Sequence, residues 1–381
     1  MSSKWILRFG CLGQIAALGI LWVFEAVRMK DLGIGETTIG LILGFSSGVT
    51  IVGSLFWARL ADRHHAHRRV VIWGSICFAV VMWYFSFCTQ VWHFVLYASI
   101  KSFVAPMVMG VMPAMAVKAF EGAQRGRSFG IYRAFGSMGF MIGSMVLPLV
   151  LNDIVRVAQV GSLLILASVL LVRQLPEPDI KPAKLAPLKF RDVNPIIKLF
   201  LLSFFFIAMS EPAVHGFFSA YARQLGGSTR LLGMLSGFMG LVALLSLPLI
   251  GKWIDRINPT HILTASFLAQ AIRVMINSTI GEVEFLWIPI LLHGLCWGGV
   301  EVAAVVYLSS LASEGHKATV LSYYLSVRML GQLFGSGLSG YLAEHAGYIV
   351  MFRTMSAIAF LGTLIFVLGS YRSRTKSVAQ S

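Results

Sequence analysis

Long apolar runs separated by short polar loops dominate the chain. Each run holds about 20 residues, the length at which an α-helix crosses the hydrocarbon core of a bilayer. A lipid-facing segment must satisfy its own backbone hydrogen bonds, so each run is expected to be helical. The pattern predicts twelve spans, at about residues 5–27, 38–60, 70–88, 92–117, 129–151, 154–172, 196–221, 230–251, 261–280, 285–311, 319–343 and 348–371.

The composition agrees with an integral membrane protein. Hydrophobic residues make up 57% of the chain, charged residues 12%, and the mean hydropathy is +0.78. Water-soluble domains carry roughly 25% charged residues, so this chain cannot be a set of them. The predicted class is an all-α membrane protein with twelve transmembrane helices.

An internal duplication divides the chain into two parts. Five residues of one pattern recur at a constant offset of 193 positions. Such a repeat predicts two pseudo-symmetric six-helix bundles, as in transporters whose solute site lies at the repeat interface. The bundles are expected at residues 1–172 and 196–371, with a proline-rich cytoplasmic linker at 173–195 and a cytoplasmic tail at 372–381. The recurring pairs are Gly33 and Gly226, Gly40 and Gly233, Gly44 and Gly237, Asp62 and Asp255, and Arg63 and Arg256.

Basic residues are distributed unequally between the two sides of the predicted membrane. With both termini inside, the cytoplasmic side holds twenty-one Lys and Arg residues and the opposite side six. This excess predicts cytoplasmic termini in a bacterial-type inner membrane. The net charge of +15 is spread over short loops, so we expect a lipid bilayer and no nucleic acid as its partner.

Ionisable residues inside the spans are the candidate site. A charge near the bilayer centre costs at least about 2.5 kcal/mol, so we expect these residues to line a solute or proton pathway. The alternative is that they form structural ion pairs between helices. Cations outnumber acids here, which favours an anionic solute such as a small carboxylate. The predicted solute-binding residues are Lys101, Arg133 and Arg328, with Trp297 and Tyr324 as aromatic neighbours.

Coupling to protons requires a group that can lose its charge as the cavity reorients. Carboxyl groups can do so and arginine cannot. Glu301 is the first candidate because it lies two turns from His293 on nearly the same helix face. Glu211 is the second, and Pro212 after it predicts a kink. Arg273 completes the predicted proton-coupling group; the alternative is that Glu301 is a static partner of Arg273 or Arg328.

Two loops carry a family resemblance. The sequence from Ala58 to Arg63 and its repeat from Gly251 to Arg256 resemble the G-x-x-x-D-R loop of the major facilitator superfamily, although Ala58 replaces the usual glycine. The resemblance implies two six-helix bundles that alternate access to a central site. It also implies a gating role for Asp62, Arg63, Asp255 and Arg256; the simpler alternative is a positive-inside anchor.

A narrower resemblance begins at Phe129. The stretch from Phe129 to Phe140 is similar to the fifth helix of the phenylpropionate permease, lactose permease and nucleoside symporter group, which also has residues matching Arg273 and His293. The acidic residues which that group carries in helices four and eight are absent here, and Cys296 replaces a third. These departures argue against a lactose-type sugar site.

An enzyme is not expected. The stretch from Gly44 to Gly48 has the form G-x-S-x-G but lies inside an apolar helix, and no phosphate-binding loop is present. His64, His65 and His67 lie in a basic loop that repels cations, and the four cysteines lack paired spacing. We therefore expect neither a metal nor a cofactor.

The sequence thus predicts a monomeric secondary active transporter, a proton-coupled symporter that imports a small organic anion by alternating access. Two alternatives stay open. One is an importer of a neutral nucleoside or sugar, and the other is a proton-exchanging exporter of drugs or metabolites.

Overall fold

The computed structural model describes residues 2–120, 125–178, 190–254, 256–313 and 316–378. These residues form helices, turns and loops, with no β-strand among them. Residues 179–189 of the predicted linker lie outside the described residues.

The chain divides into two compact units. Unit 1 comprises Met1–Pro182 and Ser219–Leu241, and unit 2 comprises Ala183–Phe218 and Val242–Ser381. The segment Ser219–Leu241 follows the predicted linker in sequence yet belongs to unit 1. The segment packs closely on this unit at Gly233. A Cβ atom added there would lie only 2.6 Å from the carbonyl oxygen of Ser144. The predicted bundle boundaries, which place this segment in the second bundle, stay a prediction.

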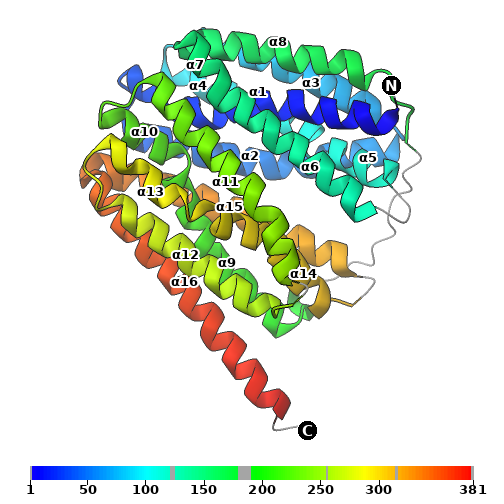
Figure 1. Cartoon of the computed structure of the whole chain (residues 1–381), viewed down its shortest axis with the longest axis vertical. Coiled ribbons are helices and arrows are strands. Elements are labelled where there is room, and N and C mark those ends of the chain that lie inside the picture. Colours follow the sequence, from blue (N-terminus) through cyan, green and yellow to red (C-terminus); the bar gives the residue numbers. More distant parts are fainter. Residues whose placement is uncertain (1, 121–124, 179–189, 255, 314–315, 379–381) are drawn as a thin grey trace. The chain divides into compact units, whose positions relative to one another are not determined.

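Unit 1 is built around its first helix, α1 (Ser3–Asp31), which packs against α6 (Arg125–Met141) and α8 (Ile154–Val172). These three helices run side by side in Figure 1. The other helices of the unit are α2 (Glu36–Arg63), α3 (His67–Phe85), α4 (Val91–Met109), α5 (Val111–Ala119), the π-helical turn η1 (Ile142–Val146) and α7 (Leu147–Leu151).

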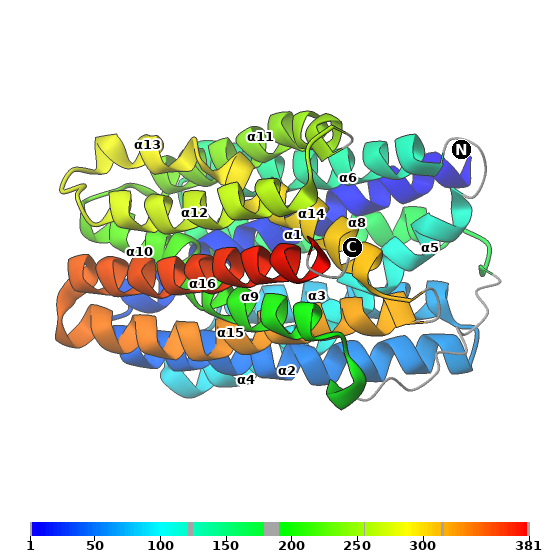
Figure 2. The same ribbon diagram turned by 90° about the horizontal axis from the view of Figure 1, so that it is seen from below.

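Unit 2 is built around α9 (Pro195–Val214), which packs against α15 (Lys317–His345) and α16 (Gly347–Val378). Figure 2 shows these three helices together. The remaining elements are the 3-10 turns η2 (Phe190–Asp192) and η3 (Val283–Leu286), α12 (Pro259–Asn277), α13 (Trp287–Ile290), the π-helical turn η4 (Gly294–Gly298) and α14 (Gly299–Leu311). Helices α10 (Gly216–Gln224) and α11 (Thr229–Ile254) each contribute to both units.

Helical segments occupy all twelve predicted spans, which confirms the fold class. Among the described residues, ten segments are long and apolar enough to cross a membrane. The other two predicted spans correspond to α12 and α15. These helices carry Gln270, Arg273 and Arg328, which line the cavity described below, and Gln332, which hydrogen-bonds to the cavity residue Glu211.

Several predicted spans are interrupted helices. The predicted kink after Glu211 is confirmed: α9 ends at Val214, His215 has φ −119° and ψ −93°, and α10 begins at Gly216. Pro212 has no amide hydrogen and cannot continue the hydrogen-bond ladder. The tenth span contains the π-helical turn η4, a kind of bulge frequent at functional sites. Both breaks occur beside the cavity.

Small residues allow close helix packing inside unit 2. Gly331 and Gly335 of α15 face α9, and a Cβ atom at Gly331 would lie 2.8 Å from the carbonyl oxygen of Phe205. Nearby, Phe204 of α9 packs on Tyr324 of α15, with ring centroids 4.7 Å apart. Contacts of this kind hold transmembrane helices together by van der Waals packing. They fix α15, and with it Arg328, against α9.

Candidate functional site

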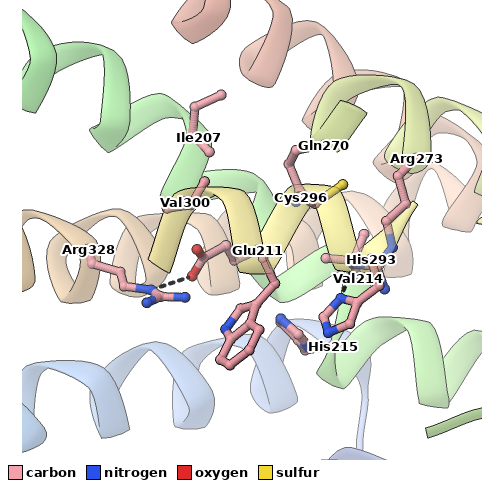
Figure 3. Close-up of a pocket in the computed structure, with 11 residues that line it drawn as sticks. Ile207, Glu211, Val214, His215, Gln270, Arg273, His293, Cys296, Val300 and Arg328 are labelled. Atoms are coloured by element: carbon pink, nitrogen blue, oxygen red, sulfur yellow. Dashed lines mark hydrogen bonds and ion pairs between the residues drawn. The ribbon is translucent and has the colours of Figure 1, made fainter. Parts of the chain in front are cut away.

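A small polar cavity lies inside unit 2 (Figure 3). Its volume of about 20 Å³ has room for about one water molecule, so an organic solute can enter only if lining side chains move. Residues from α9, α12, η4, α14 and α15 line it, together with His215 at the break after α9 and His293 just before η4. The lining residues are Ile207, Glu211, Val214, His215, Gln270, Arg273, His293, Cys296, Trp297, Val300 and Arg328.

Arg328 is held by two carboxylates from two other helices. Its Nε donates to Oε2 of Glu211 on α9 at 3.1 Å, and its NH1 donates to Oε1 of Glu301 on α14. The side chains of Arg328 and Glu211 are 14% and 11% exposed, whereas that of Glu301 is 27% exposed. Glu301 is therefore the acid that water reaches more easily.

Glu211 also accepts a second hydrogen bond. Nε2 of Gln332, one turn after Arg328, donates to its Oε2 at 2.6 Å. The sequence argument considered only ionisable residues and missed Gln332 and Gln270. A side-chain amide in an apolar helix also costs free energy in the hydrocarbon core. Gln270 and Gln332 could have been identified from the sequence on that ground.

Arg273 and His293 form the other end of the cavity. NH1 of Arg273 lies 2.9 Å from Nδ1 of His293, and the guanidinium is 1% exposed. A guanidinium only donates, so Nδ1 is the acceptor and this ring is neutral. His293 stacks on Trp297 with centroids 6.1 Å apart and meets His215 edge-on. A proton on Nδ1 of His293 would remove the bond to Arg273.

The charges beside the cavity balance more closely than the sequence suggested. Arg273 and Arg328 carry two positive charges, and Glu211 and Glu301 carry two negative charges when ionised. The observed ion pair of Glu301 is with Arg328, and its proton-coupling role stays a prediction. Tyr324 is 4% exposed on α15, and its hydroxyl has no hydrogen-bond partner among the described residues.

Two of the predicted solute-binding residues, Lys101 and Arg133, belong to unit 1. Nζ of Lys101 is 2.5 Å from Oε2 of Glu25, and the two side chains are 12% and 4% exposed. The ammonium also lies 5.3 Å from the ring centre of Tyr97. Arg133 is exposed on α6. Lys101 and Arg133 as solute contacts thus stay predictions.

The predicted gating residues show one specific contact. Oδ1 of Asp62 lies 3.0 Å from Nε2 of His67, which is 2% exposed, and the pair closes the loop between α2 and α3. Arg63 and Arg256 are exposed, and Asp255 lies outside the described residues. No group of three potential metal ligands occurs in the part of the chain that the structure describes. The gating role stays a prediction.

Twelve helical spans, an internal repeat and a buried set of ion pairs define a secondary transporter of the major facilitator type. The sequence model of the MFS_1 like family matches residues 5–354. The chain therefore belongs to this family. Its relatives are transporters rather than enzymes, and the chain is an integral membrane protein.

Comparisons with individual proteins agree with this assignment. The chain is 25% identical to multidrug resistance protein MdtG of Rahnella sp. over 92% of this chain and 89% of that protein. It is 24% identical to MdtG of Escherichia fergusonii, with coverages of 96% and 93%. The crystal structure of the nucleoside transporter NupG matches with a TM-score of 0.77 and 16% identity, over 97% of this chain and 99% of that one. An auto inhibited POT family peptide transporter matches with a TM-score of 0.73 and 14% identity, with coverages of 96% and 97%.

Proposed function

We propose that this protein is a proton-coupled importer of a small organic anion, in which protonation of a carboxyl group makes Arg328 available to the solute. One observation carries the proposal: a single guanidinium in the cavity wall is bound by both Glu211 and Glu301. Arginine keeps its charge at all relevant pH values, so only the two acids can change the state of this group.

The proposed order of binding follows from the charges. With both acids ionised, Arg328 and its partners sum to one negative charge, which repels an anion. One proton on Glu301 removes that excess and breaks an ion pair. The guanidinium face that Glu301 occupied can then bind a solute carboxylate through two parallel hydrogen bonds. Release of the solute and the proton re-forms the ion pair, so the empty carrier returns with Arg328 paired to both acids.

Glu301 is the preferred proton carrier, and Glu211 has a structural role beside it. Glu211 is less exposed and already accepts hydrogen bonds from Arg328 and Gln332. Those bonds hold its carboxylate in place between α9 and α15. Glu301 has one such bond among the described contacts and is more exposed. Protonation of Glu301 also allows Arg328 to move, which the small cavity requires before a solute can enter.

The other predicted residues fit around this centre. Trp297 stacks on His293 and lines the cavity, where its indole could pack on an aromatic acid. Lys101 is also paired with a carboxylate, so it would bind a solute only after Glu25 is protonated or moves. Arg133 is exposed and needs no such release.

A second candidate function is proton-coupled export of drugs or metabolites. It rests on the relatives named multidrug resistance protein, which match over more than nine-tenths of this chain. The same Glu301 and Arg328 pair would serve an exporter, with protonation from the outer side displacing the solute. Import and export therefore differ in the direction of coupling, which transport measurements decide.

The testing experiment uses purified protein in liposomes and labelled carboxylates, nucleosides and sugars, with and without an inward proton gradient. Accumulation of a carboxylate, up to about tenfold per pH unit for one proton per solute, supports the proposal. Accumulation of neutral solutes alone overturns the anionic site. Solute loss from preloaded liposomes, driven by the same gradient, supports the exporter.

A further inference from the structure

Arg8 is a buried cation near the beginning of unit 1. It lies in the second turn of α1 and is 9% exposed. Its Nε is buried, and no hydrogen-bond acceptor contacts it among the residues that the structure describes. Arg223 and Arg328, by contrast, each pair with a carboxylate. Burying a charged group without such a partner costs free energy, so this guanidinium requires an acceptor that the described part of the chain does not supply.

Two aromatic rings hold the guanidinium but do not satisfy its donors. Cζ of Arg8 lies 4.7 Å from the ring centre of Trp5 and 5.9 Å from that of Phe120, the buried residue that follows α5. A ring face attracts the positive charge, but it accepts no ordinary hydrogen bond from N–H groups that lie in the guanidinium plane. The rings therefore fix the position of the cation and leave its hydrogen bonds to another group.

The position of Arg8 along α1 corresponds to the boundary between hydrocarbon and lipid headgroups. The helix has 29 residues, whereas about 20 cross the hydrocarbon core, so its first and last turns extend beyond that core. Helical side chains lean toward the N-terminus, which brings the guanidinium of Arg8 nearer to the headgroups than its Cα atom is. Trp5 and Phe9 are exposed and stack on each other with ring centroids 5.9 Å apart. An exposed tryptophan at this level is typical of the membrane interface.

Exposed lysines add positive charge around Arg8. Lys4 lies four residues before it, on the same face of α1, and Lys118 is in the last turn of α5. In both views of the fold (Figures 1 and 2), α5 lies near the N-terminal end of α1. Neither residues 1–24 nor α5 include an acidic side chain. This end of unit 1 therefore attracts anions.

We infer that Lys4, Trp5, Arg8, Lys118 and Phe120 form a binding site for the phosphate of an anionic phospholipid, and we name these residues the lipid site. Phosphate oxygens match the planar fork of a guanidinium, and the two lysines attract the net charge of the lipid. A lipid fits better than a soluble anion, because the exposed rings beside Arg8 offer an apolar surface to glycerol and acyl chains. The positive-inside pattern predicts that this is the cytoplasmic leaflet.

Native mass spectrometry of the full-length protein in mild detergent tests the lipid site, with phosphatidylglycerol and phosphatidylcholine as the probes. The parent should bind phosphatidylglycerol more tightly than phosphatidylcholine. Arg8→Gln should bind phosphatidylglycerol at least about tenfold more weakly, since hydrogen bonds to a charged group contribute a factor of this size. Arg8→Lys keeps the charge without the planar fork, so its affinity should lie between those of the parent and Arg8→Gln. The matched control is Arg59→Gln, the same change at an exposed position of α2, which should bind as the parent does.

Thermal unfolding in detergent gives a second readout and distinguishes a lipid from a free anion. Phosphatidylglycerol should raise the melting temperature of the parent, because a ligand that binds only the folded state stabilises it. The same lipid should leave the melting temperature of Arg8→Gln unchanged. Inorganic phosphate at the same concentration should not stabilise the parent. Equal stabilisation by inorganic phosphate would show that the site takes a soluble anion and would overturn the assignment to a lipid.

Glu121 follows Phe120 in the sequence and lies outside the described residues, so Glu121→Gln is measured as well. It should bind phosphatidylglycerol as the parent does. Binding at least about tenfold tighter would indicate that this acid occupies Arg8, and the inference would fail.

Two further results would overturn the lipid site. One is equal affinity of the parent and Arg8→Gln for phosphatidylglycerol. The other is an equal loss of affinity in Arg59→Gln, which would indicate a general effect of charge. Because the measurements use neither a gradient nor a transported solute, their outcome is independent of the proposed anion import.

Discussion

Nε of Arg328 on α15 lies 3.1 Å from Oε2 of Glu211 on α9, so two residues 117 positions apart form one ion pair within the cavity wall of unit 2. Glu301 of α14 binds the same guanidinium through NH1. Three helices therefore meet at one cation. Any change of charge at this point alters the contacts of all three, which is what coupling between a proton and a helix movement requires.

The first prediction concerns Glu301→Gln. The substitution keeps the shape of the side chain but removes its charge and its ability to exchange a proton, while Arg328 keeps Glu211. Gradient-driven accumulation should fall to the equilibrium level, and solute exchange without a gradient should stay within about threefold of the parent, because the effect is on coupling rather than on folding. Both rates are measured in proteoliposomes.

The matched control for that variant is Glu284→Gln, the same chemical change at an exposed position of η3. It should leave accumulation and exchange unchanged. Undiminished accumulation by Glu301→Gln would remove this residue from the coupling mechanism.

The second prediction concerns Arg328→Lys. Lysine keeps the charge but cannot bind two carboxylates through a planar fork, so at least one acid loses its partner. Uptake should fall about tenfold or more, and the protein should remain folded. Arg328→Met, which leaves both acids without the cation, should also lower stability by about 3–5 kcal/mol. Initial uptake rates and thermal unfolding in detergent distinguish the two variants; equal uptake by Arg328→Lys and the parent would contradict the bidentate role.

The third prediction concerns the packing of α15 on α9. A Cβ atom at Gly335 would overlap the carbonyl oxygen of Met209, and backbone cannot move aside as a side chain can. Gly335→Ala should therefore destabilise the protein by about 1–3 kcal/mol. The added Cβ atom of Gly251→Ala, in α11, would have no neighbour within 4 Å. This variant should have the stability of the parent or be slightly more stable. The melting temperatures of the two variants test this prediction. Equal melting temperatures would disprove the close contact at Gly335.

The fourth prediction concerns orientation. Gly281→Cys, in the exposed loop after α12, should react with a membrane-impermeant maleimide in intact cells. His64→Cys, in the exposed loop after α2, should react only after permeabilisation. The measurement uses a Cys77→Ser background, because Cys77 is exposed, whereas Cys11, Cys88 and Cys296 are buried and should react slowly. The reverse labelling pattern would invert the predicted topology.

The sequence predicted the helical spans well because the cost of exposing backbone to lipid is a local property of each segment. It also identified Arg328, Glu211, Glu301, Arg273 and His293, since any polar group in an apolar helix is conspicuous. It did not predict which of these pair. Periodicity gives the face of a helix on which a residue lies but not the neighbouring helix that this face meets.

The loop after α2 shows the same limit. The repeated Asp62 and Arg63 predicted a gating role but not the observed partner of Asp62, which is His67, five residues away. The π-helical turn η4 was also missed, because nothing in the residues from Gly294 to Gly298 distinguishes it from ordinary helix.

By itself, the sequence determined that this protein is a duplicated bundle of membrane helices with charges inside, because hydrophobicity, length and repeat offset are written along the chain. Only the tertiary structure decided that Glu211 and Glu301 share Arg328, that Arg273 meets His293, and that Ser219–Leu241 belongs to unit 1. These are contacts between segments far apart in sequence. They depend on how close glycine-lined helices approach and how each helix is rotated about its own axis, and neither quantity can be read from one segment alone.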